Sequence, residues 1–198
     1  ATLYNYQLLA YIGEDGVAAY SVIGYTAMIF SSIFMGYALG SSPLLSYQYG
    51  AQNHREMRSI LKKSLLLIAF FSGVMFVAAE TFAPMLCAIF VSYDPELLEF
   101  SVQAYRIYAI VFLIMGLPIY GSAFFTALNN GIVSAIIAFL RTLVFECGAV
   151  ILLPLFLGIE GIWLSVSVAE LCAAVLTAIF MVTLRNRYGY GKKTASQA

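Results

Sequence analysis

The feature that most constrains this chain is a long run without charge, because the sequence contains no charged residue from Gly16 to Asn53. A helix needs only about 20 apolar residues to cross the hydrocarbon core of a bilayer. In a soluble protein, so long an apolar helix would have no way to bury its outer face. A basic amphipathic segment, from Arg55 to Lys63, follows the run at once. The pattern therefore predicts a transmembrane helix that leaves the bilayer close to Asn53.

The composition of the whole chain points the same way, with 62% hydrophobic and 10% charged residues. Soluble globular domains carry about 25% charged residues. We therefore predict an integral membrane protein, with the lipid bilayer as a partner and no nucleic-acid partner. The three cysteines lie in apolar runs and lack the spacing of a metal site, so we expect neither a metal nor a cofactor; they are Cys87, Cys147 and Cys172.

The apolar runs divide the chain into five complete spans, at roughly 17–45, 64–91, 98–127, 132–157 and 162–184. Residues 1–12 are apolar but too short to span, and we interpret them as the remnant of a sixth helix. Asn53 and Asp94 are predicted helix caps, the latter with Pro95 in the first helical position. No alternation typical of transmembrane strands is present. The prediction is an all-α membrane protein, with a bundle over 1–184 and a cytoplasmic tail over 185–198 that we expect to be frayed.

The basic residues predict the orientation, because eight of the ten lie in two places: Arg55, Arg58, Lys62 and Lys63, then Arg185, Arg187, Lys192 and Lys193. Five spans in series put both places on one side of the membrane. The loops on the other side are acidic and contain Glu14, Asp15, Asp94, Glu96, Glu99 and Glu160. Basic loops stay in the cytoplasm. We expect a multi-pass protein of the plasma membrane, a bacterial inner membrane, with its C-terminus in the cytoplasm.

Two of the charged residues inside the predicted spans, Glu80 and Arg106, flank the turn at Asp94. Each lies roughly 20 Å from that turn at 1.5 Å per residue, on adjacent antiparallel helices. A charged side chain costs roughly 2.5–3.5 kcal/mol at the bilayer centre and usually has a partner. The spacing favours a structural ion pair between the two helices, with a role in transport as the alternative.

Three further charges lie deep in the last two spans: Arg141, Glu146 and Glu170. Arg141 and Glu170 both fall roughly 15 Å deep, near the midplane. Five residues of α-helix rotate a side chain by about 140°, so Arg141 and Glu146 are expected on different faces. The matching depth of Glu170 and Arg141 favours Glu146 as the unpaired carboxylate, while which of the two glutamates titrates stays open. The three residues form either a structural network or a site whose unpaired carboxylate takes up a proton or a cation.

One segment carries a family resemblance. Pro43 to Gln52 reads PLLSYQYGAQ, which resembles the P-x-x-S-x-x-Y-G-A motif of the MATE (multidrug and toxic compound extrusion) transporters through Pro43, Ser46, Tyr49, Gly50 and Ala51. In that family the motif lies at the inner end of the second helix of each half. Weaker matches follow in the family's order: Leu8–Gly13 with Val17–Tyr20, Arg141 with Pro154, and Gly158–Trp163 with Ala169–Glu170.

The resemblance implies one bundle of a two-bundle transporter, in which twelve helices enclose a cavity that opens alternately to each side. This chain would be the C-terminal bundle, and the missing N-terminal half of the polypeptide would be its partner. Family members exchange cationic or amphipathic drug-like substrates for H⁺ or Na⁺. The sodium-coupled branch has acidic residues on the first and fourth helices of this half, but the span 98–127 has none beyond Glu99. The coupling ion stays open between H⁺ and Na⁺.

Two other functions are alternatives to drug export by cation antiport. A lipid-linked oligosaccharide flippase of related architecture would line its cavity with several basic residues, and only Arg106 and Arg141 are available. An enzyme would need a nucleophile with its base or a metal cluster. The single His, at His54 in a loop, and the scattered cysteines argue against catalysis.

Overall fold

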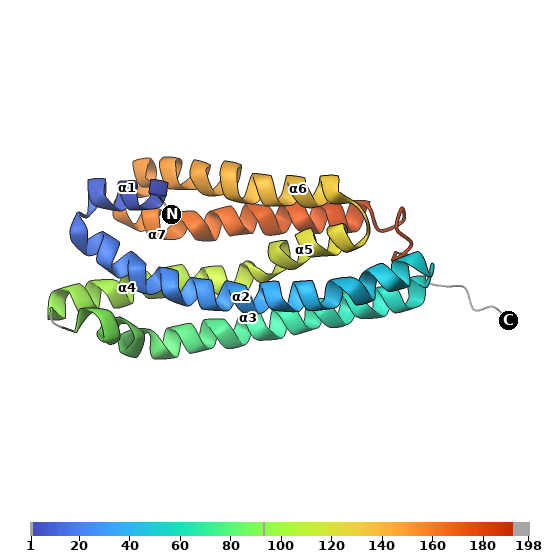
Figure 1. The fold of residues 1–198 in the computed structure, drawn as a ribbon. Helices are drawn as coiled ribbons and strands as arrows, with labels where there is room; N and C mark the ends of the chain where they lie inside the picture. Colours follow the sequence, from blue (N-terminus) through green and yellow to red (C-terminus); the bar gives the residue numbers. More distant parts are fainter. Residues whose placement is uncertain (1, 93, 192–198) are drawn as a thin grey trace.

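The computed structural model describes residues 2–92 and 94–191, which form an elongated bundle of helices (Figure 1). No strand occurs in these residues. The helices are α1 (Thr2–Tyr11), α2 (Glu14–Gly50), α3 (His54–Val91), α4 (Pro95–Ile114), α5 (Gly116–Ala127), α6 (Gly131–Phe139), the π-helical segment η1 (Leu140–Glu146) and α7 (Cys147–Thr183). α4 and α5 run between the α2–α3 pair and the α6–α7 pair and pack against both (Figure 1).

The helix starts predicted from the sequence are present. The Asn53 side chain accepts a hydrogen bond from the backbone N–H of Glu56 at 3.3 Å. The Asp94 carboxylate accepts from two backbone N–H groups, of Glu96 at 2.9 Å and of Leu97 at 3.2 Å. These bonds satisfy donors that the first helical turn leaves free. Because α3 begins at His54, the basic residues up to Lys63 form its first turns and not a separate segment.

The third predicted span, 98–127, is broken at Met115 into α4 and α5. The cause is Pro118, since a proline lacks the N–H donor and its ring clashes with the carbonyl four residues earlier, at Ile114. α5 then packs closely between its neighbours. A Cβ on Gly116 would lie 2.7 Å from side-chain atoms of both Phe34 in α2 and Ile68 in α3. A residue without a side chain is therefore needed where the new helix begins.

The last long helical run folds back on itself at Gly158, in agreement with the two predicted spans on either side. Gly158 has φ 58° and ψ −135°, a conformation that essentially only glycine adopts. The two arms then approach closely, since a Cβ on Gly161 would lie 2.5 Å from the Leu153 carbonyl oxygen. The run from Gly131 to Thr183 is thus a hairpin, with α6, η1 and the start of α7 antiparallel to the rest of α7 (Figure 1).

The expectation that the chain frays from Arg185 onwards is wrong for residues 185–191. Tyr188 and Tyr190 are buried, and they supply the apolar area that the otherwise polar segment lacks. The Tyr190 hydroxyl donates to the Met181 carbonyl at 2.7 Å, and Arg58 Nε donates to the Tyr190 carbonyl at 2.9 Å. The segment is therefore fastened to α3 and α7. Lys192 and Lys193 lie outside the described residues.

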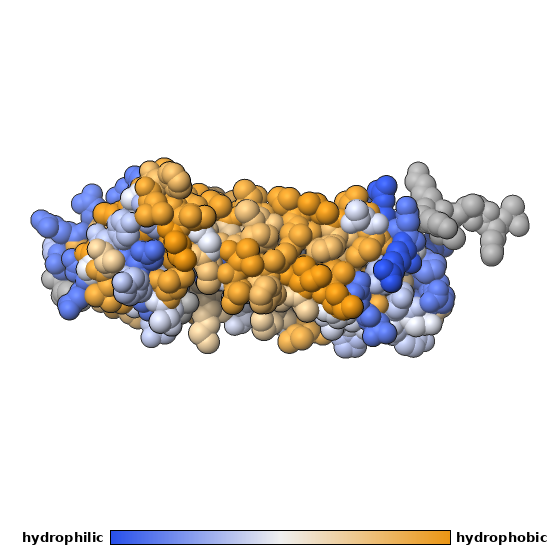
Figure 2. Space-filling model, turned by 90° about the horizontal axis from the view of Figure 1, so that it is seen from above, coloured by the Kyte–Doolittle hydropathy of each residue, from blue (hydrophilic) through white to orange (hydrophobic). Residues whose placement is uncertain are grey.

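The face of the molecule seen in Figure 2 has a broad hydrophobic middle between two hydrophilic ends. Four helical runs are long and apolar enough to cross a membrane, the last being the hairpin of 131–183. With the hairpin counted as two, the bundle has five complete transmembrane helices and the short α1. The basic end, near the α2–α3 junction and the end of α7, contains Arg55, Arg58, Lys62, Lys63, Arg185 and Arg187. The acidic end contains Glu14, Asp15, Asp94, Glu96, Glu99 and Glu160.

Candidate functional site

An ion pair lies inside the α6–α7 hairpin, between Arg141 in η1 and Glu170 in α7. Arg141 Nη2 lies 2.7 Å from Glu170 Oε1, and Nε donates to Oε1 at 2.9 Å and to Oε2 at 3.1 Å. The side chains are 27% and 9% exposed, respectively. Both residues lie near the middle of their arms, as their predicted depths required. A carboxylate that accepts several N–H bonds from one guanidinium is held in a fixed orientation.

The backbone that carries Arg141 is a π-helix from Leu140 to Glu146, which the sequence did not reveal. A π-helix hydrogen-bonds each residue to the one five positions away. Five residues therefore turn a side chain by a different angle than in an α-helix, which applies to Arg141 and Glu146. The prediction that they lie on different faces assumed the rotation of an α-helix, which this segment does not have, and no ion pair joins the two side chains. π-Helical turns are rare and frequently occur at functional sites.

Glu146 is half-buried and forms no ion pair with any residue that the structure describes. It borders a pocket of about 110 Å³ between α1 and the hairpin, lined also by Leu3, Tyr4, Thr142, Cys147 and Val150. Arg141 is engaged by Glu170, so the third residue of the set keeps a free carboxylate. We call Arg141, Glu146 and Glu170 the charge cluster.

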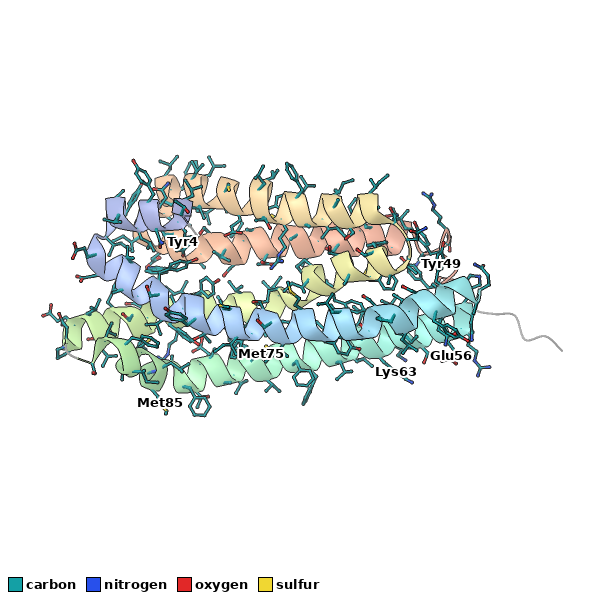
Figure 3. The ribbon with its side chains drawn as sticks, viewed as in Figure 1. Tyr4, Tyr49, Glu56, Lys63, Met75 and Met85 are labelled. Carbon is teal, nitrogen blue, oxygen red and sulfur yellow. The ribbon has the colours of Figure 1, made fainter. Side chains whose placement is uncertain are left out.

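Tyrosines from three other helices surround the charge cluster. The buried Tyr108 of α4 lies within electrostatic range of all three charges. Tyr4 of α1 stacks on Tyr20 of α2, with ring centroids 4.3 Å apart, and donates its hydroxyl to the Ile162 carbonyl at 2.8 Å (Figure 3). The sequence prediction missed these residues, because fourteen tyrosines are spread along the chain without a distinguishing pattern. Tyr4 also lines the pocket that Glu146 borders, but its hydroxyl bonds to the backbone and not to the charged groups.

The second predicted pair, Glu80 and Arg106, is also brought together, between α3 and α4. Glu80 Oε2 lies 3.7 Å from Arg106 Nε, beyond hydrogen-bonding distance, and the side chains are 35% and 53% exposed, respectively. This pair lies apart from the charge cluster and shares no residue with it.

The residues of the MATE-like motif lie at the basic end of the bundle and connect its helices there. Pro43 is exposed inside α2, Gly50 ends that helix, and the Ala51 N–H donates to the Tyr47 carbonyl at 2.9 Å. The Ser46 hydroxyl donates to the Ala127 carbonyl at the end of α5, at 3.0 Å. The Tyr49 ring packs against Tyr188 with centroids 5.9 Å apart (Figure 3). Within this chain, the motif therefore fastens α2 to α5 and to the segment after α7.

The charge cluster does not have the composition of a metal centre. Within residues 2–92 and 94–191, no group of three or more His, Cys, Asp or Glu side chains lies close enough together to hold a metal ion. The cluster instead combines one ion pair and one carboxylate without an ion-pair partner among the described residues. Such a set can hold a charge within the membrane or exchange a proton with water.

Solved structures of known transporters share this fold. An outward-facing multidrug resistance MATE family transporter matches with a TM-score of 0.87 at 19% identity, over 94% of this chain and 42% of its own. The inward-facing conformation of such a transporter matches with a TM-score of 0.84 at 19% identity, over 98% of this chain and 44% of its own. A transporter of the same superfamily from Pyrococcus furiosus matches with a TM-score of 0.79 at 21% identity, over 98% and 43%.

Sequence relatives agree with the structural ones. The multidrug export protein MepA of Staphylococcus aureus strains MSSA476 and N315 is 24% identical over 184 residues, which are 90% of this chain and 39% of the relative. This chain thus spans well under half the length of the relatives that it matches. The family model named MatE matches residues 6–149. The chain therefore belongs to the MatE family, that of the multidrug and toxic compound extrusion transporters.

Proposed function

We propose that this chain is one half of a secondary transporter that exports cationic or amphipathic drug-like compounds in exchange for H⁺ or Na⁺. Family membership and the multidrug export relatives support the class of transport. The observation that supports a role in ion coupling is that the two glutamates of the charge cluster differ in their partners. Glu170 engages Arg141, and Glu146 keeps a carboxylate without an ion-pair partner among the described residues.

In this proposal Glu146 is the group that takes up the proton or cation. The adjoining pocket, of about 110 Å³, has room for a few water molecules or a hydrated path to the carboxylate. Neutralising a carboxylate inside the membrane removes much of the cost of burying it, so uptake changes which conformation is favoured. Arg141 and Glu170 hold the two arms of the hairpin in register while this happens.

The half-bundle is proposed to move as one body against the other half of the transporter. Support comes from its similarity to outward-facing and inward-facing structures alike, with TM-scores of 0.87 and 0.84. A bundle that changed its internal packing between the two states would resemble one of them much better. Rocking of one bundle against another is a usual route to alternating access.

The basic end is proposed to face the cytoplasm of a bacterial plasma membrane, following the positive-inside rule. Single cysteines at the exposed positions Asn53 and Glu96 test this in whole cells. An impermeant thiol reagent should label the cysteine at 96 from outside and the one at 53 only after the membrane is opened. Labelling of both from the same side contradicts the topology.

The flippase alternative is not favoured. A diphosphate-binding cavity needs free basic side chains, and Arg141 is already neutralised by Glu170 at 2.7 Å. The other arginine within the spans, Arg106, is 53% exposed and lies 3.7 Å from Glu80, which offsets its charge.

The decisive experiment is Glu146→Gln in the full-length transporter, reconstituted in vesicles with an imposed H⁺ or Na⁺ gradient. Because Gln keeps the size but cannot titrate, gradient-driven ethidium export should fall roughly tenfold or more while the folded yield stays normal. Glu160→Gln, an exposed carboxylate at the acidic end, is the matched control and should transport normally. Unchanged export by the Glu146 variant would remove this residue from the coupling chemistry.

A further inference from the structure

A groove at the basic end, between α3 and the end of α7, takes no part in the proposed coupling. Its volume is about 440 Å³. Apolar walls are formed by Leu61 and Leu65 from α3 and by Met181 and Val182 from α7. α5 packs against both of these helices. Two arginines, Arg58 and Arg185, line the same groove.

Charged and apolar side chains are arranged in layers in this groove. On α3, Leu61 and Leu65 lie about 4.5 Å and about 10 Å further into the bundle than Arg58, at 1.5 Å per residue. Met181 lies in the last turn of α7, and Arg185 follows the end of that helix at Thr183. The two arginines therefore lie nearer the hydrophilic end than the leucines and Met181 that form the apolar walls. A phospholipid has the same order, with its phosphate outside and its acyl chains inside.

The Arg58 guanidinium is held in place and still has free donors. Its Nε donates to the Tyr190 carbonyl at 2.9 Å, which leaves the Nη groups for a ligand. Tyr190 is in turn fixed by its hydroxyl bond to the Met181 carbonyl and by edge-to-face packing on Phe124, with centroids 5.3 Å apart. A guanidinium that is already oriented loses less entropy when it binds an oxyanion.

No carboxylate lines the groove to neutralise these arginines, as far as the described residues show. Glu56, the acidic residue of the first turn of α3, lines a different groove between α2 and α3, together with Lys63 (Figure 3). The arginine pair therefore presents unneutralised positive charge above an apolar surface. Basic pockets between helices at the membrane boundary are suited to anionic lipid head groups.

We propose that this groove binds an anionic phospholipid from the leaflet at the basic end. The phosphate lies between Arg58 and Arg185, and an acyl chain follows the apolar walls. The bound lipid fastens the end of α7 to α3, through groups that the coupling proposal does not use.

Lipid-dependent thermal stability of the purified full-length protein tests the charge requirement. Dioleoylphosphatidylglycerol should raise the Tm more than dioleoylphosphatidylcholine does, and Arg185→Gln should weaken the apparent affinity for the anionic lipid roughly tenfold. Arg55→Gln, an exposed arginine of the same helix outside the groove, is the matched control and should respond like wild type. Arg58→Gln is less useful, since it also breaks the bond to Tyr190. Equal effects of both lipids, or equal losses in the 185 and 55 variants, overturn the proposal.

A tryptophan in the groove tests the position of the lipid. Val182 is 58% exposed, and the chain has one native tryptophan, the buried Trp163. In Val182→Trp, brominated phosphatidylglycerol should quench the added fluorescence, and should quench it less when Arg185→Gln is combined with it. Glycerol phosphate, which lacks chains, should not displace the lipid. Absence of quenching by any brominated lipid would show that protein covers the groove, and the proposal would then fail, whatever the outcome for Glu146.

Discussion

The hairpin of α3 and α4 and the hairpin of α6, η1 and α7 each carry one ion pair between their arms, and the two pairs differ in almost every physical respect. Glu80 and Arg106 lie 3.7 Å apart on regular α-helices and are 35% and 53% exposed. Glu170 and Arg141 lie 2.7 Å apart, with two additional bonds from Nε, and are 9% and 27% exposed.

The difference shows that the spacing of charges predicts which residues meet but not how much the contact contributes. An exposed pair gains little, because its partners stay solvated and lose side-chain entropy on meeting. A buried pair is costly to break, because the remaining partner is left as an unpaired charge. Of the two hairpins, only the second has a π-helix among the described residues, and that segment contains Arg141.

The largest expected effect follows from breaking the buried pair. Glu170→Gln should destabilise the protein by about 3 kcal/mol or more, since it strands the Arg141 guanidinium inside the bundle. Glu80→Gln is the matched control and should cost less than about 1 kcal/mol. Thermal unfolding of the purified full-length variants in one detergent measures both. Equal losses of stability in the two variants would show that the buried ion pair contributes no more than the exposed one.

Double-mutant cycles sharpen the same comparison with a smaller signal. The coupling free energy between Arg141→Gln and Glu170→Gln should exceed about 1.5 kcal/mol, since the two side chains bond directly. For Arg106→Gln with Glu80→Gln the coupling should stay within about 0.5 kcal/mol, because 3.7 Å is too long for a hydrogen bond. A strong coupling at the exposed pair would mean that the surrounding membrane screens it far less than its exposure suggests.

The sequence was sufficient to predict the structural features that depend on hydrophobicity and on helix-capping side chains. The uncharged run up to Asn53 predicted α2, and the side-chain chemistry of Asn53 and Asp94 predicted the starts of α3 and α4. Residue depth predicted which charges meet, because depth along a helix depends only on counting residues.

Features that depend on tertiary contacts could not be predicted in this way. The π-helix at 140–146 has a sequence that suits an α-helix equally well, so nothing local distinguishes the two. The tyrosines around the charge cluster come from α1, α2 and α4 and have no shared pattern in the sequence. The ordering of 185–191 depends on the places that the bundle provides for Tyr188 and Tyr190.

The turns of the two hairpins also differ, and substitution is expected to be more costly at Gly158 than at Asp94. Gly158→Ala should destabilise the protein by about 1–2 kcal/mol, because φ 58° with ψ −135° is strained for any residue with a Cβ. No atom lies within 4 Å of that Cβ, so the cost comes from the backbone alone. Gly148→Ala, inside α7 with equally open surroundings, is the control and should be neutral or slightly stabilising. Equal Tm values for the two variants would show that the bend tolerates a side chain.

The smallest effect is expected at the turn of the other hairpin, from Asp94→Ala. The lost carboxylate satisfies two N–H groups, at 2.9 and 3.2 Å, and loss of an N-cap typically costs about 1 kcal/mol. Asp94 is exposed at the acidic end, so water can replace the missing acceptor and should reduce the cost further. Asp94→Asn keeps an acceptor oxygen and should stay close to wild type in the same unfolding measurement. If Asp94→Ala proved costlier than Gly158→Ala, the α3–α4 hairpin would be the more strictly built of the two, and the order argued from the ion pairs would be reversed.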